Sequence, residues 1–405
     1  MAAGHSNIRR AFSPGRRMIY YFFLLGFFAI FSTTIAKNPV LPLFTRALGA
    51  NETVIGLIAA VSPVAGILFS FPVGVLSDKF GRRLLLVTSG AVFLIAPLLY
   101  LLIADALWLI PVRFFHGTAT AILGPVISAV IAECYPAQKG EMLGQYSSAT
   151  LAGRSLAPLC GGIILSLFAT CPGLVPYRAV YITAALAAVP VFLMTLMYRK
   201  EHAAPIDAPV FSNFYDSFIA FFANRRLRAT AIVDMATYFT FGAFETFLPV
   251  FLSSRTINAY ETGIIFAVQV LIIAATKPFF GRLADRVDKR IQIGTGLLLI
   301  GVSVAAIPLM QAFAGFLVVS AALGLGMSLS TVATSAYVAD VAKKEQIGAS
   351  MGALSSVMDI GHSSGPLVTG IIITVAGFTT GFFTSFLLAV AVTGIFAVSV
   401  RDRAP

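Results

Sequence analysis

The segment Gly74-Val-Leu-Ser-Asp-Lys-Phe-Gly-Arg-Arg83 is a short polar loop between two long apolar runs, and it decides the fold. A second copy, Gly281-Arg-Leu-Ala-Asp-Arg-Val-Asp-Lys-Arg290, begins 207 positions later. An offset that several features share indicates a chain built from two homologous halves. Within one position, the same offset relates Pro42 to Pro249, Gly153 to Gly361 and Pro158 to Pro366.

The composition around these loops excludes a soluble domain. Of the 405 residues, 58% are hydrophobic and only 11% are charged, whereas soluble domains average roughly 45–50% and about 25%. The surplus apolar surface must face lipid, where only helices or closed barrels satisfy the backbone. Barrel strands need alternation over roughly ten residues, but the apolar runs here are continuous and about 20 residues long. The sequence therefore predicts an all-α membrane protein.

Twelve transmembrane helices are predicted, and the basic residues orient them. Most of the 28 Lys and Arg residues fall in the tails and in alternate loops, while the loops of the opposite side hold Arg46, Arg178 and Arg255. Cytoplasmic loops of membrane proteins carry such an excess of basic residues. We therefore expect a protein of the cytoplasmic (inner) membrane with both termini on the cytoplasmic side. The net charge of +11 is then a topology signal, and no nucleic acid is expected as a partner. The predicted spans are 18–44, 53–76, 84–104, 106–132, 143–169, 175–198, 229–253, 260–283, 291–311, 313–339, 347–375 and 378–399.

The longest polar interruption, at 199–228, divides the spans into two pseudo-symmetric six-helix bundles. We expect the N-terminal bundle at 18–198 and the C-terminal bundle at 229–399, with short cytoplasmic tails at 1–17 and 400–405. Duplicated six-helix halves are typical of alternating access, with the substrate site between the halves near the middle of the bilayer.

These motifs resemble those of the major facilitator superfamily. The loop from Gly74 to Arg83 is similar to its cytoplasmic signature, although Asp288 stands where the second copy would have Gly, which predicts a less tight turn. Arg113-Phe-Phe-His-Gly117 is similar to its Arg-x-x-Gln-Gly element. Gly153-Arg-Ser-Leu-Ala-Pro-Leu-Cys-Gly-Gly162 resembles the motif of its drug–proton antiporters, with Ala157 in place of the usual Gly. The resemblance implies the twelve-span fold of that family.

The resemblance also implies a cytoplasmic gate and a helix-bending motif. Asp78 can pair with Arg82 or face the N-terminus of the eleventh span, where the helix dipole favours an anion, and Glu133 is a further partner for Arg82. Such contacts would close the inner face; alternatively, the loops only anchor the topology. The gate candidates are Gly74, Asp78, Gly81, Arg82, Arg83, Glu133, Gly281, Asp285 and Arg290, and the bending candidates are Gly153, Pro158, Gly161, Gly162, Gly361, Gly365 and Pro366.

Ionisable groups inside the spans are the candidates for proton coupling, because such groups usually face a cavity or a partner. Asp359 and His362 are three residues apart, on one helical face, and histidine titrates near neutrality. A static polar contact is the alternative for this pair. Asp234 lies about one turn inside its span, where it either couples protons or reaches cytoplasmic water. The coupling candidates are Asp359, His362, Glu245 and Asp234.

A second group of polar residues is expected to line the substrate cavity. Glu245 matches Asn38 through the repeat and lies beside Lys37, so Lys37 and Glu245 can pair across the cavity as a permanent bridge or as part of the mechanism. Basic residues there would suit an anionic or zwitterionic solute, unless nearby acids neutralise them. The cavity candidates are Lys37, Asn38, Arg113, Arg154, Glu245 and Tyr238.

We therefore expect a secondary active transporter that exports a small organic solute in exchange for protons, and not an enzyme. A proton-coupled importer of an organic anion is the alternative. A non-transporting sensor or scaffold is disfavoured, because such a protein would usually carry an appended soluble domain. An ATP-driven pump is also disfavoured, because the sequence has no Gly-x-x-x-x-Gly-Lys-Ser/Thr loop for ATP. We expect a monomer in membrane lipid that uses the proton gradient and needs no cofactor and no metal.

Overall fold

A computed structural model describes residues 14–136, 138–198, 218–255, 257–343 and 347–400. Within these ranges all regular elements are helical. The N-terminal half contains α2 (Pro14–Ile35), α3 (Val40–Ala47), α4 (Glu52–Phe80), α5 (Arg82–Tyr100), η1 (Ala106–Trp108), α6 (Leu109–Cys134), α7 (Lys139–Leu167) and α8 (Val175–Met197). The C-terminal half contains α10 (Arg225–Ser253), α11 (Ala259–Ala284), α12 (Lys289–Ala306), η2 (Ile307–Leu309), α13 (Phe313–Val341) and α14 (Ile347–Ser399).

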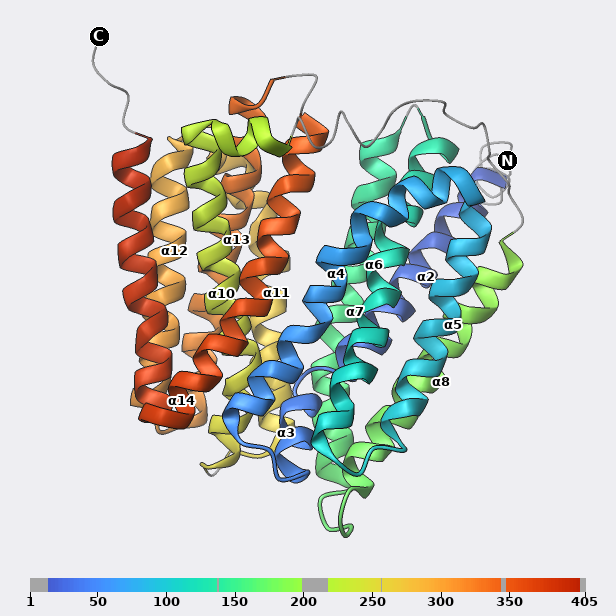
Figure 1. Ribbon diagram of the computed structural model, residues 1–405, viewed down its shortest axis with the longest axis vertical. Coiled ribbons are helices and arrows are strands. Elements are labelled where there is room, and N and C mark those ends of the chain that lie inside the picture. Colours follow the sequence, from blue (N-terminus) through green and yellow to red (C-terminus); the bar gives the residue numbers. More distant parts are fainter. Residues whose placement is uncertain (1–13, 137, 199–217, 256, 344–346, 401–405) are drawn as a thin grey trace, which may run out of the picture.

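The helices form two bundles that lie side by side (Figure 1). In the N-terminal bundle, α2 packs on α7 and α8, and α5 and α4 pack on α6. In the C-terminal bundle, α10 packs on α14, α11 on α13, and α12 on both α13 and α14. Two helix pairs make the largest contacts between the bundles, α4 with α14 and α7 with α11, and the repeat relates one pair to the other; α3 also contacts α10.

Helix α14 is two membrane spans in one continuous stretch. Its 53 residues would extend roughly 80 Å at about 1.5 Å per residue, far more than the ~30 Å hydrocarbon core. Gly377 breaks it with a φ of 81°, a conformation that glycine adopts without a steric penalty. Eleven helices of the described residues are long and apolar enough to cross a membrane, and this break makes twelve crossings. The predicted twelve-helix, all-α membrane fold is confirmed.

The first predicted span, 18–44, is wrong in one respect, because it is two helices and not one. Residues 36–39 form turns between α2 and α3. Pro39 has no N–H for the helical ladder, and it disfavours the α conformation at the preceding residue. The break places Lys37 and Asn38 at the end of a helix inside the membrane.

The two copies of the repeated loop turn differently, as Asp288 led us to expect. Between α4 and α5 a single residue, Gly81, makes the turn with a φ of 86°. Between α11 and α12 the chain needs residues 285–288, and the Asp288 side chain accepts a hydrogen bond from the Arg290 N–H as the N-cap of α12. The chain therefore replaces a glycine turn with a capped one.

The two ends of the molecule differ. We call the end at which α2 begins and α14 ends the terminal end, and the opposite end the α3 end. The bundles meet at the α3 end and diverge toward the terminal end (Figure 1). The expectations for the tails at 1–17 and 400–405 and for most of the linker at 199–228 lie outside the described residues, although residues 218–223 are helical.

Candidate functional site

A cavity of about 370 Å³ lies between the two bundles. The N-terminal bundle lines it from the α2 end, α4, α6 and α7, and the C-terminal bundle lines it from α10 and α14. All six residues of the predicted cavity group line it, together with Asp359 and His362. These six are Lys37, Asn38, Arg113, Arg154, Tyr238 and Glu245.

A polar network on the cavity wall joins the bundles. The Lys37 ammonium lies 2.5 Å from Glu245 Oε2, and Asn38 donates a hydrogen bond to Glu245 Oε1. His362 Nε2 lies 2.9 Å from Glu245 Oε2 and 3.2 Å from Lys37 Nζ. The ion pair predicted between Lys37 and Glu245 is therefore present, and Asn38 and His362 bond to it as well. We call Lys37, Asn38, Glu245 and His362 the central network.

The His362 nitrogen in this network cannot serve both neighbours at once. With a proton, Nε2 donates to Glu245; without one, it accepts from the Lys37 ammonium. The ring is held by aromatic neighbours on α10, since Tyr238 lies nearly parallel to it with centroids 6.3 Å apart and Phe241 meets it edge-on at 5.7 Å. The site thus contains a positioned imidazole whose hydrogen-bond partner depends on its protonation.

Three charged side chains in the cavity lack an ion-pair partner among the described residues. Arg113 is 2% exposed and its Nε has no hydrogen-bond partner, and Arg154 projects from α7 into the cavity. Asp359 lines the same cavity from α14 and makes no hydrogen bond or ion pair with any described residue. Gly66 on α4 makes room for it, because a Cβ there would lie 3.0 Å from Asp359 Oδ2. Among the described residues, no carboxylate forms an ion pair with Arg113 or Arg154, although Glu245 and Asp359 line the same cavity.

Sequence reasoning missed the polar cluster behind Arg113. His116 Nδ1 lies 3.3 Å from the Tyr100 hydroxyl, and Tyr100 stacks on Tyr181 with ring centroids 4.4 Å apart. His116 Nε2 and the Tyr181 hydroxyl are buried without a hydrogen-bond partner in the described part of the chain. The His116 of the quoted Arg-Phe-Phe-His-Gly element was the available signal, but the tyrosines come from distant helices and carry no motif.

Asp234 does not reach water at the end of its span, so that alternative is wrong. Helix α10 begins at Arg225, four residues earlier than predicted, which places Asp234 nine residues inside it. Its side chain is 4% exposed and accepts a hydrogen bond from Thr334 on α13 at 3.4 Å. It lies within the C-terminal bundle and not on the cavity wall.

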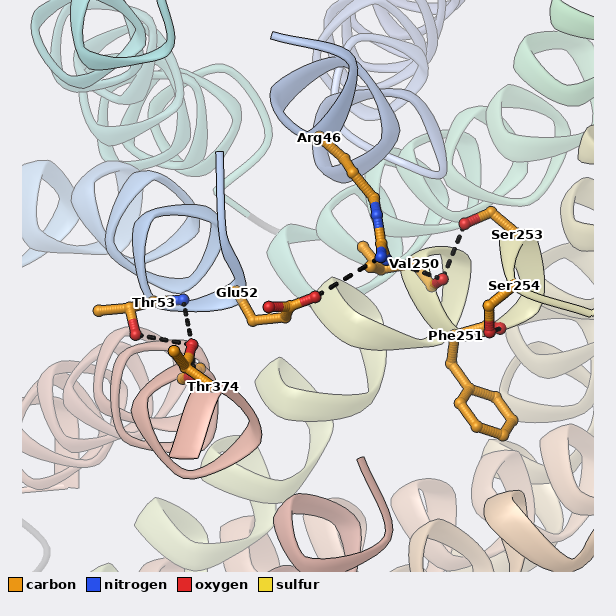
Figure 2. Close-up of polar contacts among 9 residues, drawn as sticks. Arg46, Glu52, Thr53, Val250, Phe251, Ser253, Ser254 and Thr374 are labelled. Atoms are coloured by element: carbon orange, nitrogen blue, oxygen red, sulfur yellow. Dashed lines mark hydrogen bonds and ion pairs between the residues drawn. The ribbon is translucent and has the colours of Figure 1, made fainter. Parts of the chain in front are cut away.

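At the α3 end, hydrogen bonds join the bundles directly (Figure 2). Thr53 at the start of α4 donates its N–H to Thr374 Oγ1 on α14 at 3.1 Å, and the two hydroxyls are 2.8 Å apart. Arg46 on α3 lies 3.8 Å from Glu52 and donates to the Val250 carbonyl of α10 at 3.4 Å. A further bond between the bundles runs from the Tyr260 N–H to Ser166 Oγ at 3.0 Å.

The glycines of the predicted bending motif lie at close contacts between helices. A Cβ on Gly153 would collide with the Phe27 carbonyl of α2, and one on Gly361 or Gly365 would collide with carbonyls of α10. Gly161 lies against the turn between α2 and α3, and Gly162 lies against α11, where a Cβ would come within 3.2 Å of Gly263 Cα. Pro158 and Pro366 also contribute carbonyls to the contacts between bundles. The motif residues thus serve close packing of α7 and α14.

The predicted gate residues lie at the terminal end. Arg82 pairs with Glu133 at 2.6 Å and donates to Ser77, but all three belong to the N-terminal bundle, so the pair does not close a gap between bundles. The side chain of Asp78 and the residue Gly74 lie outside the part of α4 whose side chains are described, so its expected pairing is not placed. Arg83, Asp285 and Gly281 lie at or near the start of α5 and the end of α11, and Asp285 is exposed.

The second half has its own version of this pair, which sequence reasoning missed. Lys289 Nζ lies 2.9 Å from Asp340 Oδ2, and the 207-residue offset relates these residues to Arg82 and Glu133. Arg290 donates to the Val400 carbonyl. Applying the offset to Glu133 would have identified Asp340.

Among the described residues no group of three or more His, Cys, Asp or Glu side chains is placed to hold a metal ion.

Two helical bundles around a polar, membrane-embedded cavity define a membrane transporter. The family model described as Major Facilitator Superfamily matches residues 22–257 and again 230–405. The chain belongs to the major facilitator superfamily. It is an integral membrane transporter of small organic solutes, and it is not an enzyme.

Known proteins resemble it along most of its length. An uncharacterized MFS-type transporter of Methanocaldococcus jannaschii is 24% identical over 357 residues, 87% of this chain and 91% of that protein. Multidrug resistance protein 1 of Bacillus subtilis is 22% identical over 370 residues, 91% and 92% of the two chains. The crystal structure of the nucleoside transporter NupG superimposes with a TM-score of 0.80 at 14% identity, over 95% of this chain and 99% of that one. These likenesses agree with the fold described above.

Proposed function

We propose that this chain exports a small organic solute in exchange for protons by alternating access. The observation that carries the proposal is the central network, in which one histidine nitrogen is shared between a lysine of one bundle and a glutamate of the other. A proton on Nε2 of His362 favours the contact with Glu245, and an unprotonated Nε2 favours the contact with Lys37. Proton binding thereby changes the bonding between the bundles, which is what a coupled transporter requires.

The orientation follows from charge. Basic residues gather at the terminal end, at the start of α5, α10 and α12, whereas the basic residues near the α3 end are Arg46 in α3, Arg178 in the first turn of α8 and Arg255 just after α10. The positive-inside rule assigns the terminal end to the cytoplasm. On this assignment the described conformation is closed to the outside by the contacts at the α3 end and diverges toward the cytoplasm.

Export is supported by the drug–proton antiporter motif from Gly153 to Gly162 and by the relative named as a multidrug resistance protein in Bacillus subtilis. Asp359 is the second candidate for a coupling site, since it faces the cavity without a partner among the described residues. A carboxylate in this position can bind a proton or a cationic group of the solute, and competition between the two gives exchange.

Transport into right-side-out vesicles with an imposed pH gradient tests the direction. Three probes share one skeleton: para-(aminomethyl)benzoic acid as a zwitterion, its methyl ester as a cation and its N-acetyl derivative as an anion. An antiporter takes up its probe when the vesicle interior is acidic. Uptake driven by external acid would support the importer instead, and uptake that ignores the gradient, or no uptake of any probe, would contradict the proposal.

Asp359→Asn tests the coupling site in the same vesicles. We expect pH-driven uptake to fall at least about tenfold, while exchange of labelled for unlabelled N-acetyl probe, which has no ammonium group, continues without a gradient. Glu141→Gln, which removes an exposed carboxylate at the start of α7, is the matched control and should behave as the parent. Unchanged pH-driven uptake in Asp359→Asn would show that Asp359 does not carry the proton.

A further inference from the structure

We propose that the cavity is a binding site for zwitterionic, partly aromatic solutes. On this account, the carboxylate of the solute binds between Arg113 and Arg154, and its ammonium group binds Asp359. This inference rests on the proposed transport function and adds the class of solute.

The first step is to separate the charges that are already satisfied. Lys37 and Glu245 neutralise one another at 2.5 Å, and Asn38 and His362 complete their hydrogen bonds. The central network therefore offers a solute little net charge. What remains in the cavity is Arg113, Arg154 and Asp359, none of which has an ion-pair partner among the described residues.

The second step concerns what these charges require. Arg113 is buried, whereas Asp359 is half-buried and Arg154 is exposed. A buried charge without a partner is costly, because the membrane interior offers little solvation, so the requirement is strongest at Arg113. Arg113 is 2% exposed, and its Nε is a buried donor with no acceptor among the described residues. A carboxylate is the ligand that guanidinium groups bind best, since it accepts two parallel N–H donors. The two arginines therefore form a site for a carboxylate or a similar compact anion.

The third step is the arrangement of the charges across the bundles. Both guanidinium groups come from the N-terminal bundle, on α6 and α7, and the free carboxylate comes from α14 of the C-terminal bundle. A simple anion would face Asp359 without compensation, and a simple cation would face two arginines. A zwitterion that lies across the cavity pairs with both sides, so it also connects the two bundles that must move.

The remaining wall of the cavity indicates an aromatic or apolar body for the solute. Tyr238 and Phe241 of α10 line the cavity beside Ile30 and Met358. Binding cavities of roughly 300–1,000 Å³ hold small organic ligands, and the volume of about 370 Å³ places this site at the lower end. The skeleton of the three benzoate probes matches this size and chemistry.

Binding of the three probes to the purified protein at neutral pH, measured by calorimetry, tests the inference. We expect the zwitterion to bind at least about tenfold more tightly than either the ester or the N-acetyl derivative, because each lacks one charge-assisted contact. Arg154→Gln should abolish the preference for the zwitterion over the ester. Asp359→Asn should abolish the preference over the N-acetyl derivative. Lys277→Gln, which removes a cation of α11 that does not line the cavity, should preserve both preferences.

The outcomes separate this inference from the proposed function. Equal or tighter binding of the ester or of the N-acetyl derivative would overturn the zwitterion site, even if pH-driven transport of that probe persisted. Loss of binding in Lys277→Gln as large as in Arg154→Gln would also overturn it, since the effect would then be general electrostatics. Tight zwitterion binding without pH-dependent transport would leave the site in place and refute the proposed antiport.

Discussion

The contacts at the α3 end and the contacts at the cavity obey different rules. At the α3 end one hydrogen bond keeps the twofold repeat, because Thr53 with Thr374 and Tyr260 with Ser166 are its two copies, whereas the contacts of Arg46 have no second copy. The glycine contacts repeat as well. A Cβ on Gly56 would approach Pro366 and Gly370, and one on Gly263 would approach Pro158 and Leu159, one residue after the proline.

At the cavity the repeat is broken at the positions that carry charge. Glu245 of the C-terminal bundle stands where the N-terminal bundle has Asn38, and His362 stands where it has Arg154. Lys37 and Asp359 have no charged counterpart at the related positions, Phe244 and Leu151. We infer from this difference that the repeated contacts at the α3 end hold the bundles together where they open and close. The charges that differ between the bundles lie in the cavity, where a solute would bind. A symmetric cavity would place like charges opposite one another.

The largest effect is expected from breaking the asymmetric centre. Glu245→Gln leaves the Lys37 ammonium without its ion-pair partner, and the Lys37 side chain is only 22% exposed. Removing one partner of a buried pair costs about 3 kcal/mol, so we expect a loss of that size in chemical unfolding and a loss of transport. The double reversal of Lys37→Glu with Glu245→Lys should restore more activity than either single reversal. Equal loss of activity in the two single reversals and in the double reversal would show that the ion pair between Lys37 and Glu245 is not what transport requires.

A smaller, symmetric effect is expected at the glycine contacts. Gly162→Ala and Gly370→Ala each add a methyl group where the bundles touch, against the backbone at Ala259 and at Glu52. Overpacking costs about 1–3 kcal/mol, and here it disfavours the conformation closed at the α3 end. We expect both variants to raise the labelling rate of a cysteine at position 53 by roughly tenfold.

Gly124→Ala on α6 is the control, because a Cβ there meets nothing within 4 Å. It should label at the parental rate. A large effect in only one of the two interface variants would contradict the symmetry of this end.

The smallest effects are expected from the repeated ion pairs at the terminal end, and they sharpen the comparison. Asp340 is 59% exposed, so we expect Asp340→Asn to cost no more than about 0.5 kcal/mol. Glu133→Gln removes the ion-pair partner at 2.6 Å from Arg82, whose side chain is only 10% exposed, and should cost about 1 kcal/mol. Thermal unfolding of the two variants measures the difference. A larger loss of thermal stability in Asp340→Asn than in Glu133→Gln would mean that solvent exposure does not determine how much each ion pair stabilises the fold.

Much of the fold was predictable from the sequence, because it depends on local signals. The length of apolar runs, the basic loops and the repeat of Gly74–Arg83 as Gly281–Arg290 led to twelve spans in two halves. The break at Pro39 and the early start of α10 at Arg225 were missed. The break depends on one residue inside an apolar run, and hydropathy does not register it.

The candidate site was predictable only where the repeat brought residues together. The repeat related Glu245 to Asn38, beside Lys37, and the structure places these three in contact. The repeat did not predict that His362, and not Asp359, would contact Glu245. It also did not predict that Arg113 would lack a carboxylate partner among the described residues. Those facts depend on the rotation of α14 and α6 about their axes, which tertiary packing sets.

The central claim is that the bundles separate at the α3 end during each transport cycle. Thr53→Cys with Thr374→Cys, in a background without Cys134, Cys160 and Cys171, places two thiols where hydroxyls now lie 2.8 Å apart. Oxidation should then stop transport of the zwitterionic probe into vesicles, and a reductant should restore it, while Thr53→Cys alone is unaffected. Transport at the parental rate by the fully cross-linked protein would contradict the account.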